Sequence, residues 1–276
     1  MKKIHDVDKS SFAGLMVAVG GILLGLTLEG GRLGQILQPT AALIVFGGTF
    51  GAVMIQFPLS IVLTAAASLV QVFFEGDGNP QWVVKEMVAY AQKARKAGIV
   101  SLDSELEKID EPFLKKALML AVDGTEPAEI RSIMQLKLEN DSEQDDNVPK
   151  VFECAGGFSP TIGIIGAVLG LIQVMQHLDN IGEVGRGIAV AFVATIYGVG
   201  AANLFFLPAA GKLKIRNRER QLRREIALEG VVSILEGMNP RMVETKLLGF
   251  ISESLQKENA KGAKGEAKKT ARAFQP

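Results

Sequence analysis

The feature that most constrains this chain is an apolar run, PTIGIIGAVLGLIQVM at residues 160–175, which contains three glycines and no charged residue. In a soluble helix, each interior glycine costs about 1 kcal/mol relative to alanine. Inside a bilayer the balance differs, because lipid tails are as apolar as leucine and helices associate through the close packing that small residues permit. The run therefore predicts a membrane-spanning helix with a packing face.

Four windows of the sequence are long and apolar enough to cross a bilayer, which takes about 20 residues. They cover residues 12–28, 40–57, 158–176 and 187–207. The apolar character of the second window continues past Pro58 to Phe74, which is too long for one span, so we expect a further helix at the interface. The predicted fold class is all-α, a polytopic membrane protein with four transmembrane helices and a helical cytoplasmic insert.

The predicted organisation has six segments, defined by where apolar windows give way to polar sequence. They are a cytoplasmic N-terminus (1–11), transmembrane helices 1 and 2 (12–57), an interfacial helix with a cytoplasmic helical domain (58–151), transmembrane helices 3 and 4 (152–210), cytoplasmic C-terminal helices (211–255) and a tail (256–276). The tail, KGAKGEAKKTARAFQP at its end, has almost no large apolar residue, so we expect it to be disordered.

Within the polar insert the pattern predicts a series of helices. EMVAYAQKARKAG has apolar residues at helical spacing and places Gly98 where a helix ends. Ser101 is a predicted N-cap for SLDSELEKI, and Pro127 suits the start of PAEIRSIMQLKLEND. We expect the stretch that follows, DSEQDDN, to form an acidic loop.

The orientation of the spans follows from lysine and arginine near their ends, which favour the cytoplasmic side. A basic run, KLKIRNRERQLRRE, directly follows the fourth window, whereas the two short links between spans carry only Arg32 and Arg186. Both termini and the insert are therefore predicted to be cytoplasmic. The position of the basic run beside a span favours a topology anchor over a nucleic-acid patch, so no nucleic-acid partner is expected.

Each predicted span repeats small residues at a spacing of four, the pattern that lets membrane helices approach closely. These residues are Gly21 and Gly25, Gly47 and Gly51, Gly166 and Gly170, and the series Ala194, Gly198 and Ala202. Four such faces exceed what one four-helix unit needs, so we expect some of them to contact other subunits.

Polar atoms inside the spans are few. Thr161 and Thr195 are the notable hydroxyls, and each either bonds its own helix backbone or lines a polar path. Pro160 and Pro208 stand at opposite ends of the third and fourth windows. Each is interpreted either as a helix boundary or kink or, functionally, as a hinge or gate. Aspartate, glutamate, lysine and arginine are absent from the interiors of all four windows.

The missing charge matters because proton and cation pathways generally place an ionisable group at membrane depth. Either this chain carries no ion, or a partner supplies the carboxylate and these helices enclose it.

The chain resembles the A subunit of bacterial flagellar stator units, the MotA/PomA family, within the wider MotA/TolQ/ExbB proton channel group. The resemblance covers roughly residues 12–250, and within the family the sequence is more similar to the PomA-like and MotC-like branch. The segments that carry it are SPTIGIIGAVLGLIQVM, GIAVAFVATIYGVGAANLFFLPAAGKL, ARKAGIVSLDSELE and DGTEPAEIRSIMQLKLE.

This resemblance implies a flagellar motor component for motility and chemotaxis in the bacterial inner membrane, with lipid around it. A ring of A subunits, a pentamer, would surround B subunits, each with one transmembrane helix and a peptidoglycan-binding domain. The B helix bears an aspartate, and ion flow through it would turn the ring against the flagellar rotor switch protein FliG.

The resemblance also implies roles for particular positions of this sequence. The ion pathway and its gating would involve Pro160, Thr161, Ala167, Thr195 and Pro208. Rotor contact would involve Arg95 and Asp103, with Lys96 and Glu105 as helpers, although acids of some relatives are missing at Ser104 and Leu106. Helix packing would involve Gly166, Gly170, Ala194 and Gly198.

The translocated ion is predicted to be the proton, with sodium as the alternative. Sodium-driven relatives present a hydroxyl at the position of Ala167, and without it Thr195 has fewer oxygens beside it to replace a sodium ion's hydration shell. No cofactor and no bound metal are predicted.

Three other classes of protein compete with the stator. A TolQ- or ExbB-like energiser of envelope transport usually has three spans, with the insert after the first. A self-contained transporter needs a midplane charge or broken helices in two matching halves. An enzyme is disfavoured because His5 and His177 are far apart and no phosphate-binding glycine loop or paired carboxylates occur.

Overall fold

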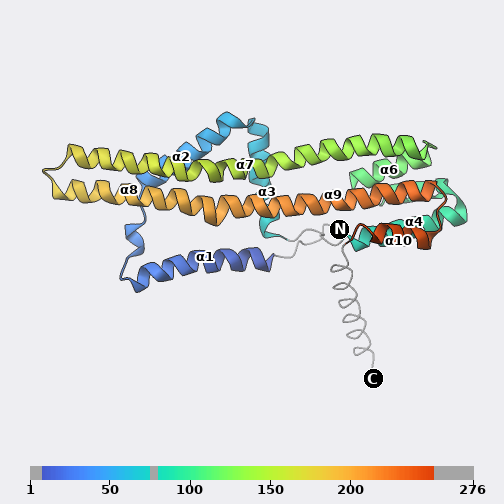
Figure 1. Cartoon of the computed structure of the whole chain (residues 1–276), viewed down its shortest axis with the longest axis horizontal. Coiled ribbons are helices and arrows are strands. Elements are labelled where there is room, and N and C mark those ends of the chain that lie inside the picture. The colour runs from blue at the N-terminus through green and yellow to red at the C-terminus, as the bar shows by residue number, and fades with distance from the viewer. Residues whose placement is uncertain (1–7, 75–79, 252–276) are drawn as a thin grey trace, which may run out of the picture. The chain divides into compact units, whose positions relative to one another are not determined.

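The computed structural model describes residues 8–74 and 80–251, and its regular structure in these ranges is helical throughout (Figure 1). The elements are α1 (Lys9–Leu28), η1 (Leu33–Gln35), α2 (Pro39–Gln56), α3 (Leu59–Phe73), α4 (Gln81–Ala97), η2 (Ile99–Leu102), α5 (Asp103–Leu106), α6 (Pro112–Val122), α7 (Pro127–Gln176), α8 (Ile181–Ala201), the π-helix η3 (Ala202–Phe206), α9 (Leu207–Leu235) and α10 (Pro240–Leu248). The predicted all-α class is confirmed. The tail predicted to be disordered, 256–276, lies outside the described residues.

Two compact units divide the chain. One contains Met1–Asp77 and Glu143–Asn217, and we call it the membrane unit; the other contains Gly78–Ser142 and Arg218–Pro276, and we call it the polar unit. The long helices α7 and α9 each contribute residues to both units.

The membrane unit contains the helices that are long and apolar enough to span a bilayer. Among the described residues these are α1, α2, α7 and the stretch that begins with α8, four in all, as predicted. None of the residues of α1 is buried. Helix α2 ends at Gln56, Pro58 follows, and the shorter apolar helix α3 occupies the place of the expected interfacial helix.

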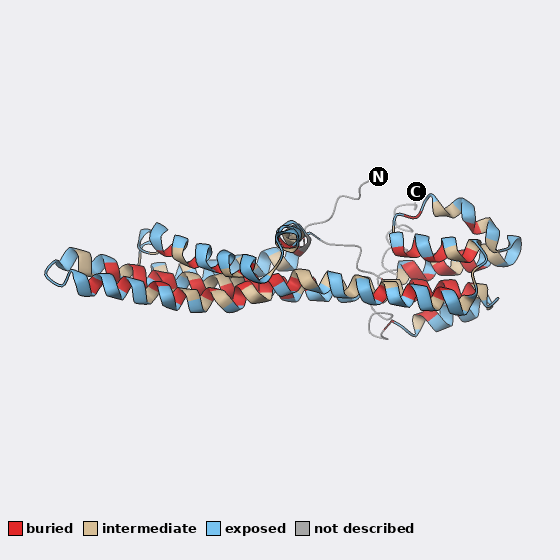
Figure 2. Cartoon of the chain, turned by 90° about the horizontal axis from the view of Figure 1, so that it is seen from above, coloured by how far each residue is buried: buried red, intermediate tan, exposed pale blue. Residues whose placement is uncertain are grey.

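Burial within the membrane unit is concentrated where α7 and α8 lie against each other. Figure 2 shows buried residues in bands along the paired helices and exposed residues on their outer faces. Helix α2 packs on α8 through a small apolar cluster formed by Ala41, Val45, Val190, Val193 and Ala194. A second cluster joins α2 and α3 to the beginning of α9 and to α7, around Phe152 and Phe206. Large apolar side chains remain exposed, as a bilayer requires.

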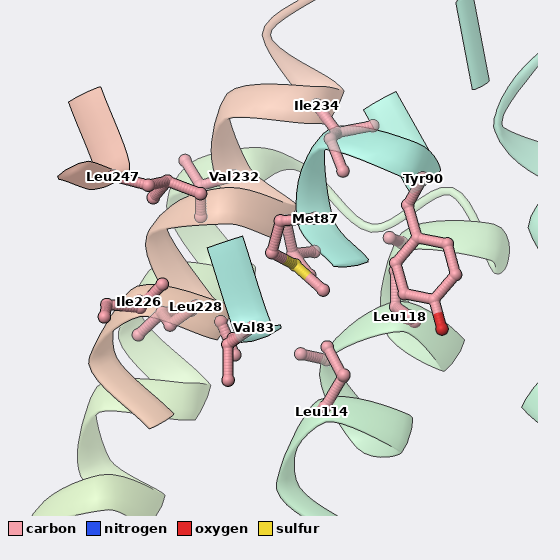
Figure 3. Packing of buried hydrophobic residues seen from close by; sticks show 14 of the residues in the cluster. Val83, Met87, Tyr90, Leu114, Leu118, Ile226, Leu228, Val232, Ile234 and Leu247 are labelled. Atoms are coloured by element: carbon pink, nitrogen blue, oxygen red, sulfur yellow. The ribbon is translucent and has the colours of Figure 1, made fainter. Parts of the chain in front are cut away.

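The polar unit has an ordinary apolar core. Met87 on α4 is fully buried among side chains of α6, α9 and α10, including Leu118, Val232 and Leu247 (Figure 3). A Cβ at Gly230 would lie 2.6 Å from Cγ of Met87, so glycine lets α9 approach α4.

The predicted helix end at Gly98 is confirmed, and the predicted cap at Ser101 is wrong. Gly98 follows α4 with φ of +79°, a conformation that glycine adopts without strain. Ser101 does not cap a helix. It lies inside η2, and its hydroxyl donates to the carbonyl of Gly98, the residue that precedes this element, at 2.6 Å.

The acidic stretch 141–147 is helical, so the predicted acidic loop is wrong. It lies inside α7, which runs without a break from Pro127 to Gln176 and tolerates Pro149 and Pro160. Its polar groups find partners on α9, where Arg224 Nη1 lies 3.6 Å from Asp141 Oδ2 and Asn217 Nδ2 donates to the Asp145 carbonyl at 2.7 Å. Arg224 on the neighbouring helix thus offsets part of the charge that would otherwise favour a solvated loop.

Candidate functional site

The contact between α7 and α8 is made by backbone rather than by side chains, because glycines face one another. A Cβ built on Gly198 would lie 2.5 Å from the carbonyl oxygen of Ser159, 3.1 Å from Cα of Gly163 and 3.2 Å from Cα of Pro160. Real Cβ atoms essentially never approach other atoms so closely. The helices are therefore in contact at a distance that only glycine permits.

The same close approach continues along the pair. A Cβ on Gly170 would lie 2.8 Å from the carbonyl oxygen of Gly187, and one on Gly166 would lie 2.8 Å from Cβ of Ala194. Gly166, Gly170, Ala194 and Gly198, assigned to packing from the sequence, thus all lie in the α7–α8 contact. Gly163 and Gly187 belong to it too and were not singled out.

Two of the residues assigned to the ion pathway, Pro160 and Thr195, lie beside this contact and close together. Pro160 faces Gly198, and a Cβ on Gly163 would lie 3.5 Å from Cα of Thr195. Thr161 is the next residue of α7 and is exposed on the outer face. The structure therefore brings the third-helix proline and both pathway threonines to one level of the helix pair.

Both threonine hydroxyls bond their own helix. Thr161 Oγ1 donates to the Phe158 carbonyl at 2.8 Å, and Thr195 Oγ1 donates to the Ala191 carbonyl at 3.2 Å. Each oxygen keeps its acceptor capacity, since a hydroxyl has one proton and two lone pairs. Toward a passing ion these side chains can offer oxygen lone pairs but not their protons.

Pro208 lies away from that level, whereas Ala167 lies near it. Ala167 is half-buried and follows Gly166, which faces Ala194, the neighbour of Thr195. Pro208 comes ten residues after Gly198, a rise of about 15 Å along a helix. It therefore belongs to a separate region of the membrane unit.

An irregular turn lies just before Pro208. Its ring nitrogen cannot donate to the carbonyl four residues earlier, and the π-helical turn η3 ends two residues before it. Asn203 within η3 donates from Nδ2 to the Val199 carbonyl at 2.9 Å, which satisfies a backbone acceptor where the helical pattern changes. Asn203 was missed from the sequence, although an amide in the apolar run GVGAANLFF is a visible signal.

Two buried hydroxyls in the membrane unit were also missed. Ser159 and Thr49 have no exposed surface, and their oxygens make no hydrogen bond to any of the residues that the structure describes. Buried polar atoms of this kind are uncommon in folded proteins. Ser159 directly precedes Pro160 and supplies the carbonyl against which Gly198 packs.

The described spans lack the ionisable group that ion transfer requires. Residues 160–176 and 187–211 contain no aspartate, glutamate, lysine or arginine. Their outer faces are apolar and exposed, with Ile165, Phe192 and Ile196 among the exposed side chains. No cluster of potential metal ligands occurs among the described residues. The helix pair offers a smooth apolar surface with a few oxygen acceptors.

The charges assigned to rotor contact lie in the polar unit. Arg95 and Lys96 end α4, and Asp103 begins α5, where all three are exposed. Within the described residues none of these three forms an ion pair. They remain available to a partner.

Glu105 differs from these three because it is already engaged. Lys93 Nζ lies 2.6 Å from Oε1 of Glu105, and Lys108 Nζ lies 3.1 Å from its Oε2. The hydrogen bonds from Lys93 and then Lys108 lower the pKa of Glu105 below its usual value. This carboxylate joins α5 to α4, so it holds the turn that carries Asp103.

A buried charge cluster at the start of α1 was not found from the sequence. Asp8 is 4% exposed and caps α1 by accepting from the backbone amides of Ser10 and Ser11. Its Oδ2 also lies 2.5 Å from Lys212 Nζ and 3.1 Å from Arg216 Nη2. The bond from Lys212, followed by that from the Ser10 hydroxyl, holds the pKa of Asp8 well below its ordinary range.

The cluster also joins three elements of the membrane unit. The Asp8 amide donates to the Phe73 carbonyl at 2.8 Å, and the Arg216 guanidinium donates to the carbonyl of Phe74. Part of the basic run interpreted from the sequence as a topology anchor is thus also structural.

Taken together, these features define a class: an all-helical, polytopic membrane protein whose closely packed span pair brings no acid of its own. The family described as the MotA/TolQ/ExbB proton channel family matches residues 105–226, and the motility protein A N-terminal family matches residues 12–98. The Motility protein A of Bacillus subtilis is 36% identical over 249 residues, covering 89% of this chain and 91% of that protein.

Solved structures agree. The flagellar MotAB stator complex from Bacillus subtilis contains a chain with a TM-score of 0.83 and 34% identity, covering 92% of this chain and 100% of that one. The C. jejuni MotAB structure gives a TM-score of 0.82 and 31% identity, covering 89% of this chain and 96% of that one. The chain belongs to the MotA/PomA family of motility proteins, within the MotA/TolQ/ExbB proton channel family.

Proposed function

We propose that this chain is the A subunit of an ion-driven flagellar stator. It assembles as a ring around B subunits, and ion flow along the interface between A and B generates torque on the flagellar rotor. The two solved relatives are MotAB complexes, which supports a B-type partner and an oligomer. The single observation that carries the proposal is the absence of any ionisable residue from 160–176 and 187–211 in a member of a proton channel family.

In this proposal the partner supplies the carboxylate, and α7 and α8 form the wall around it. A helix pair that rotates past a partner helix needs a rigid backbone and a surface whose side chains do not interdigitate deeply with those of the partner. The glycine contact at Gly198 and Gly170 fixes α7 against α8, and the exposed face remains apolar. The hydroxyl oxygens of Thr161 and Thr195 provide acceptors at the level of Pro160.

Rotor contact is assigned to Arg95, Lys96 and Asp103, with Glu105 holding the turn between them. Exposed ion pairs contribute under about 1 kcal/mol each, so such contacts can form and break repeatedly as the rotor switch protein FliG passes. Their attraction is electrostatic and steers the approach of the partner, and it weakens as salt increases.

Protons rather than sodium are proposed as the translocated ion. A sodium ion needs several oxygen ligands to replace its hydration shell. Ala167 supplies none, which leaves the hydroxyl oxygens of Thr161 and Thr195 as the side-chain ligands at this level of the helix pair, too few for a sodium ion. The proposed location is the bacterial inner membrane, with both termini on the cytoplasmic side where KLKIRNRERQLRRE lies.

A TolQ- or ExbB-like energiser is the second candidate, because it shares the channel family. The match of residues 12–98 to the N-terminal family of motility protein A favours the stator.

The test is complementation of a bacterium that lacks its own A and B subunits. Expression of this chain with its B partner is expected to restore swimming, and expression of the chain alone is not. Restoration of envelope transport in a strain without TolQ or ExbB, with no effect on swimming, would reject the stator in favour of the energiser.

A further inference from the structure

The membrane unit contains an open cavity of about 320 Å³ that lies apart from the α7–α8 contact. It lies between α1 and the η3–α9 region, with the end of α3 beside it. Its lining residues are Ser10, Ser11, Gly14, Leu15, Ala18, Val72, Phe73, Asn203, Leu204, Phe205, Pro208, Ala209 and Lys212.

Polar and apolar groups separate along the length of this cavity. On α1 the lining runs from Ser10 to Ala18, eight residues or about 12 Å of helix. On the facing helix it runs from Lys212 back to Asn203, nine residue steps or about 14 Å. Hydroxyl and ammonium groups stand at the end where α1 begins, and the lining along Leu15, Ala18, Leu204 and Phe205 is apolar. At the far end the Asn203 amide also borders the cavity, and its Nδ2 donates to the Val199 carbonyl.

The polar end carries a surplus of positive charge. Among the residues that the structure describes here, one carboxylate, Asp8, faces two cations, Lys212 and Arg216. An ammonium has three donors, and the Lys212 ammonium gives one of them to Asp8. The Ser11 hydroxyl also lines the cavity and makes no hydrogen bond within the described residues. The site therefore offers donors and net positive charge to an anion.

We propose that this cavity binds one anionic glycerophospholipid, with its phosphate at Lys212 and Ser11 and an acyl chain along Leu15 and Ala18. Charge selects this occupant. A second copy of the chain offers no acid from residues 9–28, 39–74, 154–176 or 187–211 to complement the donors of Lys212, and Glu153 on α7 already pairs with Lys214. Anionic lipids of the cytoplasmic leaflet bring a phosphate to this depth. The inference rests on the orientation proposed above.

The test uses the purified complex of A and B subunits in detergent and counts bound lipids by native mass spectrometry. Phosphatidylglycerol is expected to bind at least tenfold more tightly than phosphatidylcholine. Ala18→Phe, which fills the apolar end, is expected to abolish this binding, and Ser11→Ala to weaken it several-fold. Val17→Phe adds a similar ring on the adjacent, 75% exposed position and is expected to leave binding unchanged.

Three results would overturn the proposal. Equal loss in Val17→Phe would mean that lipid only coats α1. Inorganic phosphate that displaces phosphatidylglycerol at millimolar concentration and binds Ala18→Phe equally well would mean a free anion site. A high yield of crosslinks to a neighbouring A chain from a photoreactive residue placed at position 18 would mean that a second copy fills the cavity. None of these readouts requires rotation, so they are independent of the stator assay.

Discussion

The glycine contact between α7 and α8 gives a sharp mutational prediction. In Gly198→Ala the new methyl group would lie 2.5 Å from the Ser159 carbonyl oxygen and 3.2 Å or less from two Cα atoms. These neighbours are backbone atoms, so no rotamer change relieves the clash, and the helices must separate by about 1 Å to reach ordinary contact of roughly 3.5 Å. Overpacking of this kind costs about 1–3 kcal/mol.

A matched control lies two residues away on the same helix. At Gly200 a Cβ would meet nothing within 4 Å. Both substitutions replace a helical glycine, so both gain about 1 kcal/mol of helix propensity. The difference in unfolding free energy between Gly198→Ala and Gly200→Ala therefore isolates the steric cost, about 1–3 kcal/mol.

The assay is the thermal unfolding midpoint of each purified variant in mild detergent. For chains of this size 1 kcal/mol corresponds to about 2–4 °C, so Gly198→Ala is expected to unfold about 2–12 °C below Gly200→Ala. Equal midpoints would show that the two helices do not meet through Gly198. A lower midpoint for Gly200→Ala would place the contact on a different face of α8.

Three other predictions concern charge and ion choice. Asp8→Asn leaves two cations unpaired and is expected to cost about 3–5 kcal/mol of stability, against under about 1 kcal/mol for Glu153→Gln, whose pair with Lys214 is exposed. The folded pKa of Asp8 is lowered, so its contribution to stability is present above its unfolded pKa of about 3.9 and is lost as the pH falls through the folded value. The difference in unfolding free energy between wild type and Asp8→Asn should therefore stay constant from pH 8 to 5 and narrow below pH 4. Arg95→Glu is expected to reduce swimming speed several-fold and Asp103→Lys in the same chain to restore part of it; normal swimming of the single variant would reject the rotor assignment. Ala167→Thr is expected to make swimming speed respond to external sodium, and a sodium response already present in the wild type would contradict the proton assignment.

The spans could be predicted from the sequence because the bilayer imposes a length and forbids charge. Helix α2 begins one residue before the predicted position and ends at Gln56, since Pro39 and Pro58 mark its limits in the sequence itself. The end of α4 was also predictable, because glycine is the residue that adopts positive φ without strain, and Gly98 does so here. These features are local, and local chemistry determines them.

Features that depend on a distant partner were not predictable. The acidic stretch 141–147 looks like a loop until Arg224 and Asn217 are placed beside it. Glu105 looks like a free rotor charge, but Lys93 engages it. The Asp8 cluster needs α1, α3 and α9 to meet, and the sequence separates Asp8 from Lys212 by about two hundred residues.

The sequence predicted that these spans carry closely packing faces, but not which helix each face contacts. The four-residue spacing singled out Gly166, Gly170 and Gly198, and all three lie in the α7–α8 contact. The same spacing at Gly21 and Gly25 meets nothing within 4 Å in this chain. Spacing indicates that a close approach is possible, and only the assembled fold indicates where it occurs.

The most direct measurement is ion conductance of membranes that contain this chain with and without its B partner. The account predicts that vesicles containing the A chain alone hold a proton gradient as well as empty vesicles do, and that vesicles containing both subunits dissipate it. A proton or sodium leak through the A chain alone would contradict the account, because these helices would then conduct without a carboxylate from outside.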